Sequence, residues 1–87
     1  MEYELTQNYP NPFNPFTTIQ FSIPESGEVK LLVYNILGEQ VAELVNESKE
    51  AGVHTINFNA TELNSGLYIY KLTAGSFSAF KKMMLLK

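Results

Sequence analysis

The chain has 87 residues, of which 45% are hydrophobic and 17% charged, with no cysteine, no tryptophan and a formal net charge of −3. These values indicate one small globular domain and leave no room for a second. Because cysteine is absent, neither a disulfide nor a thiolate zinc site can hold the fold together. Apolar packing and backbone pairing must do so.

The charged residues exclude two classes of partner. All six basic residues are lysines and all nine acidic residues are glutamates. Proteins that read nucleic acids use arginine for phosphate and guanine, and a net negative charge repels anionic polymers, so we expect no nucleic-acid partner. No segment approaches the roughly 18 consecutive apolar residues of a membrane span. The acidic residues 1–5 lack the features of a signal peptide, so we expect either a cytosolic protein or part of a longer one.

Alternation of apolar and polar residues predicts short strands separated by glycine-marked turns. In the first of them, Ile19, Phe21 and Ile23 would share one buried face,. Short strands at this spacing predict an antiparallel sandwich or barrel. The clear strands are expected at residues 17–23, 28–34, 53–59, 67–73 and 77–86.

The segment between the second and third clear strands is ambiguous. Asn35 to Gly38 suits a type I turn that ends in a left-handed glycine, which predicts a three-residue hairpin with a bulge,. The apolar residues that follow, Leu37, Val41, Leu44 and Val45, have helical spacing,. The competing interpretation is a strand over residues 39–45 and a polar loop over 46–52. The periodicity slightly favours the helix, whereas the neighbouring strands favour the strand.

A proline-rich segment precedes the first clear strand. Three prolines within residues 8–16 fix the backbone and remove ladder donors, so this lead-in is extended but cannot be a central strand,. We expect its asparagines to form Asx turns, and Phe13 and Phe16 to anchor it on the domain,. We take residues 1–16 as a lead-in packed on the domain formed by residues 17–87. The alternative is a recognition segment that docks into a partner.

The end of the chain leaves an apolar face without a covering layer. Met83 and Leu85 would lie on one face of the last strand, and Met84 and Leu86 on the other. One face can enter the core, whereas the other must be covered by loop or proline-rich residues or remain exposed on an edge strand. A docking strand for another protein is the sharper interpretation.

Residues that could carry chemistry are sparse. His54 has no cysteine, serine or aspartate arranged with it, and we expect an ordinary strand histidine,. Paired catalytic carboxylates need a cleft, which a domain of 87 residues seldom supplies, so we expect the glutamates to form a solvated face,. We therefore expect no enzyme activity, no cofactor, no metal and no small-molecule substrate. A carbohydrate-binding module remains a minor alternative, with Tyr68 and Tyr70 as an aromatic platform.

Several motifs together resemble a known family. The chain resembles the C-terminal sorting domain of type IX (Por) secretion cargo, type A, in register from about Leu5 to Lys87. The matching opening includes LTQNYPNPFNP, and further matches are VYNILGEQV, AGVH and LNSGLY. The family-motif residues are Tyr9, Pro10, Asn11, Pro12, Phe13, Asn14, Pro15, Gly38, Gly52, Ser65, Gly66 and Tyr68.

The resemblance implies an all-β immunoglobulin-like antiparallel sandwich of about six or seven strands, and it favours a strand at residues 39–45. It implies a sorting signal at the C-terminal end of a parent cargo protein, which passes through the periplasm to the outer-membrane surface or the medium. The implied partners are the type IX outer-membrane translocon and a sortase-like peptidase. Recognition would use the last strand and terminal residues, Lys81, Lys82, Met83, Met84, Leu85, Leu86 and Lys87.

Three further expectations follow from the resemblance. Met1 would be an introduced start in front of a domain taken from a longer protein. A second copy could bind weakly as a homodimer through the exposed C-terminal strand. The alternative function is a structural immunoglobulin-like module of a multidomain extracellular protein, similar to the Ig-like domain of the flagellar hook-capping protein.

Overall fold

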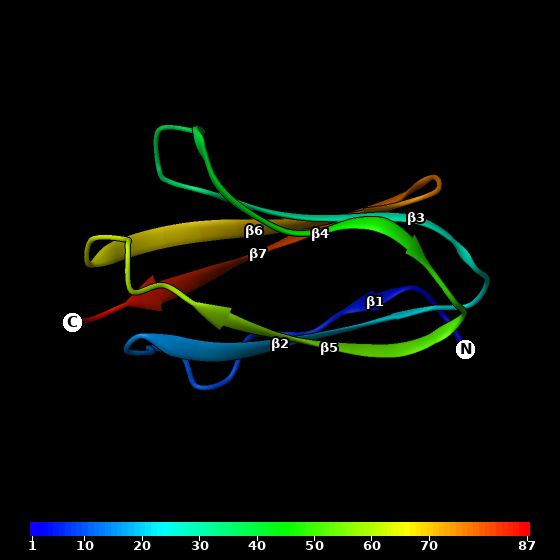
Figure 1. Cartoon of the computed structure of the whole chain (residues 1–87), viewed down its shortest axis with the longest axis horizontal. Coiled ribbons are helices and arrows are strands. Elements are labelled where there is room, and N and C mark those ends of the chain that lie inside the picture. Colours follow the sequence, from blue (N-terminus) through cyan, green and yellow to red (C-terminus); the bar gives the residue numbers. More distant parts are fainter.

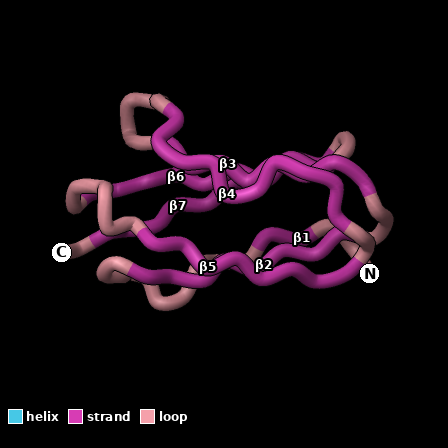
Figure 2. Tube along the Cα trace, in the orientation of Figure 1, coloured by secondary structure: helices cyan, strands magenta, loops and turns pink.

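The computed structural model describes residues 1–87 as two antiparallel β-sheets packed face to face (Figures 1 and 2). No helix of the structure has the length and apolar character needed to cross a membrane. The strands are β1 (Glu4–Leu5), β2 (Phe16–Ile23), β3 (Gly27–Tyr34), β4 (Gln40–Lys49), β5 (Gly52–Asn59), β6 (Gly66–Ala74) and β7 (Phe77–Leu85).

The order of strands confirms the immunoglobulin-like sandwich. One sheet has three strands in the order β1-β2-β5, and the other has four in the order β4-β3-β6-β7. All strand pairs within the sheets are antiparallel. The strands β1, β5, β4 and β7 are therefore the sheet edges, and β7 lies behind β6 in Figure 1.

The core lies between the sheets and follows the predicted alternation. Ile19, Phe21 and Ile23 point inward from β2 and are almost completely buried, as predicted. They meet inward side chains of the other sheet, and a fully buried aliphatic or aromatic side chain contributes about 1.5–3 kcal/mol. The fully buried members of the other sheet include Leu31, Val33, Tyr70, Leu72, Met83 and Leu85.

The turn between β3 and β4 is the predicted three-residue hairpin. The Asn35 N–H donates to the Glu39 carbonyl at 3.0 Å, and the Gly38 N–H donates to the Asn35 carbonyl at 3.0 Å. Gly38 has φ of 83°, a left-handed conformation that L side chains rarely adopt,. The Asn35 side chain accepts from the Leu37 and Glu39 amides, which makes it an Asx turn,.

The helix suggested by the periodicity of residues 37–45 is wrong, because residues 37–39 lie in the β3–β4 turn and residues 40–45 belong to β4. The pairing with β3 shifts register twice, and the shifts leave Val41 and Leu44 without a directly paired residue. Each is the extra residue of a β-bulge, which offsets the ordinary alternation. Apolar positions 41, 44 and 45 thus acquire helical spacing on an extended strand. The expected polar loop over residues 46–52 is also too long, since β4 continues to Lys49.

The lead-in forms part of the sandwich itself and does not only cover it. Its residues Glu4 and Leu5 form β1, an edge strand that pairs with Phe21 and Ser22 of β2. Phe13 is buried and lies against the ring of Phe58, as expected of an anchor. Phe16 is 61% exposed, so its expected anchoring role is wrong. It points away from the core because it shares the outer face of β2 with the exposed Gln20.

Candidate functional site: the C-terminal strand and its border

The side chains of β7 divide between the core and the surface. Met83 and Leu85 have no exposed surface, whereas Lys82 is exposed and Leu86, just beyond the strand, is 52% exposed. Met84 is half-buried on the outer face. The recognition residues expected from the sequence therefore have two positions: some hold the strand in the sandwich, and others face the solvent.

The proline-rich segment borders the outer edge of β7 over its C-terminal half. The Phe13 N–H donates to the Met84 carbonyl at 3.0 Å, and the Leu86 N–H donates to the Phe13 carbonyl at 3.0 Å. The Met84 N–H donates to Asn11 Oδ1 at 2.9 Å. Gln7 Nε2 donates to the Lys82 carbonyl at 2.6 Å. We call Gln7, Asn11 and Phe13 the clasp, because together they bond the Lys82 carbonyl, the Met84 N–H and carbonyl, and the Leu86 N–H.

The clasp corrects one prediction and answers an open question. Asn11 does not form the expected Asx turn, because its side-chain oxygen accepts from Met84 on β7 instead. The proline-rich segment was one candidate to cover the outer face of the last strand. It runs along the edge of β7 instead, and Lys82 and Leu86 remain exposed. The peptide bonds before Pro10, Pro12 and Pro15 are cis.

A buried polar centre holds the lead-in against the sandwich. Asn8 is almost fully buried, and its Nδ2 donates to Thr17 Oγ1 at 3.0 Å and to the Pro10 carbonyl at 3.1 Å. The Asn8 N–H donates to the Tyr70 hydroxyl at 2.8 Å, and that hydroxyl donates to the Thr6 carbonyl at 2.7 Å. Burial raises the pKa of Tyr70 to about 12, and the hydrogen bond from the Asn8 backbone offsets part of the rise,.

The sequence assigned no role to Gln7, Asn8 or Tyr70 as partners of the last strand or the lead-in. Tyr70 was considered with Tyr68 as an exposed aromatic platform for carbohydrate, and this is wrong because both rings are buried. Strand alternation contained a usable signal, since Tyr68, Tyr70 and Leu72 occupy the same face of β6 and that face is the core.

The C-terminal residues rest on the loop before β6. The Lys87 N–H donates to Ser65 Oγ at 2.9 Å, and Lys87 Nζ donates to the Thr61 carbonyl at 2.6 Å. The Tyr68 hydroxyl donates to the Asn64 carbonyl at 2.7 Å and steadies the same loop. Ser65 and Tyr68 of the family motif thus help to position the end of the chain.

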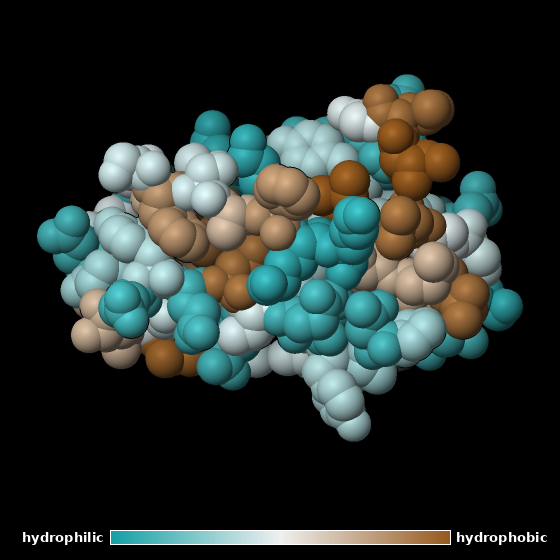
Figure 3. Space-filling model, turned by 180° about the vertical axis from the view of Figure 1, so that it is seen from behind, coloured by the Kyte–Doolittle hydropathy of each residue, from teal (hydrophilic) through white to brown (hydrophobic).

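Most motif residues gather at one end of the sandwich. The proline-rich loop, the β3–β4 turn with Gly38, the 60–65 loop and the C-terminus all lie at the left end of Figure 1. Gly52, at the start of β5, lies at the opposite end. Seen from behind, apolar surface gathers near the β3–β4 turn, and a hydrophilic band crosses the middle of this face (Figure 3).

The N-terminal half of the β7 edge is not covered by the clasp. The Met84 N–H and carbonyl point away from β6, toward the clasp. Because every second residue of a strand points its backbone groups to the same side, the N–H and carbonyl of Ser78 and Phe80 also point away from β6,. None of the hydrogen bonds outside the sheet ladders involves Ser78 or Phe80. Phe80 is 65% exposed on the outer face. This half of the edge is open.

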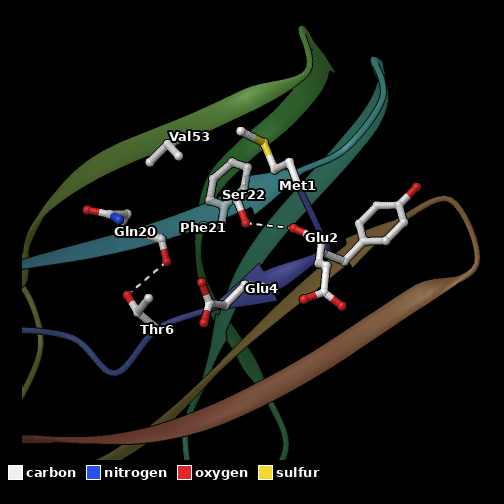
Figure 4. Close-up of a pocket in the computed structure, with 9 residues that line it drawn as sticks. Met1, Glu2, Glu4, Thr6, Gln20, Phe21, Ser22 and Val53 are labelled. Atoms are coloured by element: carbon white, nitrogen blue, oxygen red, sulfur yellow. Dashed lines mark hydrogen bonds between the residues drawn. The ribbon is translucent and has the colours of Figure 1, made fainter.

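A depression on the outer surface of β1 and β2 marks the opposite end of the lead-in (Figure 4). There the Thr6 hydroxyl donates to the Gln20 carbonyl at 2.9 Å, and the Ser22 hydroxyl donates to the Glu2 carbonyl at 2.7 Å. Both hydroxyls tie the N-terminal segment to β2. Their hydrogen bonds therefore serve the pairing of β1 with β2.

Comparison with known proteins decides the family. A model of the family described as "Secretion system C-terminal sorting domain" matches residues 7–86, nearly the whole chain. The chain belongs to this family of sorting domains. The resemblance found in the sequence is thereby confirmed. No curated protein matches the sorting domain.

Membership of the family establishes the general role. The sorting domain is a type IX secretion signal, and it serves a secreted protein that is translocated through the outer membrane. Its role requires interaction with the type IX secretion machinery and with a parent protein. The matched region includes both the clasp and the whole of β7.

Proposed function

We propose that the type IX translocon reads this sorting domain through its last strand and terminal residues, Lys81, Lys82, Met83, Met84, Leu85, Leu86 and Lys87. The observation that carries the proposal is the position of β7 at a sheet edge, with alternate side chains facing the solvent. An edge strand can offer a partner both its outer side chains and its unpaired backbone groups.

The two sets of side chains have different tasks. Met83 and Leu85 are fully buried, and their packing in the core holds β7 in place beside β6. Lys82, Met84 and Leu86 present a charged group and two apolar groups on the accessible side. A partner would gain affinity from the apolar contacts and orientation from the lysine.

The domain acts as a binding module and not as an enzyme. It travels through the periplasm attached to a parent cargo protein on its N-terminal side, and a sortase-like peptidase then acts on the parent at the outer membrane. Membership of a family of sorting signals supports this proposal, because such signals are recognised by other proteins.

The test is export of a reporter in a host with an active type IX system. A Sec signal and a fluorescent protein are fused in front of residues 1–87, and the reporter is followed to the cell surface or the medium. The informative variant is Met84→Ser with Leu86→Ser, which keeps both buried side chains of β7. Deletion of Met83 to Lys87 is less informative, because it removes two core side chains and would unfold the domain,.

The matched control is Ile36→Ser with Leu37→Ser in the β3–β4 turn, where both side chains are exposed. We expect normal export of the wild type and of this control, and periplasmic retention of the β7 variant. Equal export of both variants would overturn recognition through the last strand. Retention of the folded wild type in the periplasm would instead favour the structural Ig-like module.

A further inference from the structure

We propose that the open half of the β7 edge, Phe77 to Lys81, accepts an extended acidic segment of a partner polypeptide by β-strand addition. This inference rests on the proposed function and names the chemistry of the partner. It also places the pairing in the first half of β7, because the clasp occupies the Lys82 carbonyl and the backbone groups at Met84 and Leu86.

The first argument is the unused backbone. The outward N–H and carbonyl groups of Ser78 and Phe80 have no partner in the structure, although β7 is ordered along its whole length by β6. Ser78, Phe80 and Lys82 are all exposed, so the outer face of this edge is accessible. On the inner face, the Phe77 ring stacks on Tyr3 of the lead-in. A chain that adds here can form a regular ladder of main-chain hydrogen bonds.

The second argument is a separation of charge that the net charge conceals. Residues 63–87 hold four of the six lysines and none of the nine glutamates. The single salt bridge of the structure joins Lys49 to Glu47 on β4, so Lys71, Lys81 and Lys82 have no carboxylate within bonding distance. The β6–β7 ribbon is therefore cationic on a protein that is acidic elsewhere, and it would attract an acidic partner.

The third argument is the placement of these lysines around the open edge. Lys71 lies directly opposite Phe80 in the β6–β7 register, and Ile69 lies opposite Lys82. Phe80 thus stands between two exposed lysines on the outer face, while Lys81 points to the other face. Carboxylates on either face of an added strand would meet a lysine, and an apolar residue would meet the ring of Phe80.

The observations favour a foreign polypeptide over a second copy or an anionic membrane. Pairing of two β7 edges would bring like charges together, and the acidic edge strand β4 has two bulges that interrupt a regular ladder,. A membrane surface could neutralise the lysines but could not use the directed backbone groups of Ser78 and Phe80. Only an extended chain satisfies both.

The test uses the folded domain and short synthetic peptides, with NMR amide shifts and fluorescence anisotropy as readouts. The probe is an eight-residue peptide that alternates glutamate with valine. One control peptide alternates lysine with valine, and the other is the probe with N-methylated amides. We expect salt-sensitive binding of the glutamate peptide alone, with the largest shifts at Ser78 and Phe80. Equal binding of the N-methylated peptide, or of anionic phospholipid vesicles, would overturn strand addition.

Variants of the domain separate charge from backbone. Lys82→Glu is expected to weaken the glutamate peptide about tenfold, whereas Lys30→Glu, an exposed lysine two strands from the edge, leaves binding unchanged,. Ser78→Pro removes an outward donor and keeps every charge, and it should also weaken binding. Unfolding curves show whether Ser78→Pro is folded. If it is not, peptide binding by Lys82→Glu alone tests the site. Equal loss with Lys30→Glu would overturn a local site.

The same variants in the export assay distinguish this inference from the proposed function. If the wild-type fusion is retained in the periplasm, the proposed function fails. If the wild type is exported and Ser78→Pro, which lies outside the proposed recognition residues, is exported equally well, only the acidic-strand inference fails. A different result would be that the domain binds no peptide but dimerises with rising concentration, and that Ser78→Pro abolishes the dimer. The occupant of the edge would then be a second copy and not a foreign polypeptide.

Discussion

Phe13 of the lead-in and Leu85 of β7 form a parallel β-bridge, although they lie near opposite ends of the chain. The Phe13 N–H and carbonyl bond the backbone on either side of Leu85, and both side chains are buried. The proline-rich part of the family motif thus holds the last strand in place. The position of the final strand in this sorting domain consequently depends on a segment far from it in sequence.

Asn11→Ala should loosen the clasp without touching the core. The variant loses the acceptor for the Met84 N–H, and one such hydrogen bond contributes about 1 kcal/mol,. We expect a lower free energy of unfolding and faster hydrogen exchange at the Met84 amide. Asn14→Ala is the control, because Asn14 forms no side-chain hydrogen bond in the same segment. Unchanged exchange at Met84 would contradict the clasp.

Tyr70→Phe should destabilise the domain more than an ordinary loss of a hydroxyl. It leaves the Asn8 N–H and the Thr6 carbonyl without their partner, and a buried polar group without a partner costs about 1–3 kcal/mol,. We therefore expect a loss of about 2–3 kcal/mol in chemical denaturation. Tyr34→Phe on the outer face of β3 removes a hydroxyl that has no protein partner and should change little. Similar losses in both variants would refute this role.

Tyr70 should also make stability fall at high pH. Its pKa is about 12 in the folded protein and about 10 when unfolded, so its contribution is complete below pH 10,. The contribution is lost as the pH rises from 10 through 12, and the difference corresponds to about 3 kcal/mol. Denaturation at several pH values, beside absorbance of tyrosinate, measures it. The decisive comparison is Tyr70→Phe, which should show a smaller fall.

Gly38→Ala should destabilise the β3–β4 hairpin through the backbone alone. Gly38 has φ of 83° and no atom near a new Cβ, so conformational strain of about 1–2 kcal/mol is the expected cost,. Gly27→Ala is the matched control, because Gly27 also has free space and has no positive φ. A comparable change in melting temperature for both variants would show that the left-handed turn is not the cause.

Local pattern was sufficient for much of the fold. Alternation identified the strands β2, β3, β5, β6 and β7 and the inner face of β2, because a pleated strand places every second side chain on the same side,. It failed at β4, where bulges at Val41 and Leu44 changed the spacing. The family motifs, which are linear strings of residues, were also recognisable without coordinates.

The candidate site depended on contacts between distant parts of the chain. Nothing near Gln7 or Asn11 in sequence indicates that their side chains bind the backbone of β7, and nothing near Tyr70 indicates Asn8 as its partner. The closed and open halves of the β7 edge likewise follow from where the lead-in runs. The amino-acid pattern therefore specified most of the strands and the β3–β4 turn, since these depend on neighbouring residues. Packing of the two ends of the chain specified which edge a partner can reach, since hydrogen bonds between remote segments exist only after folding.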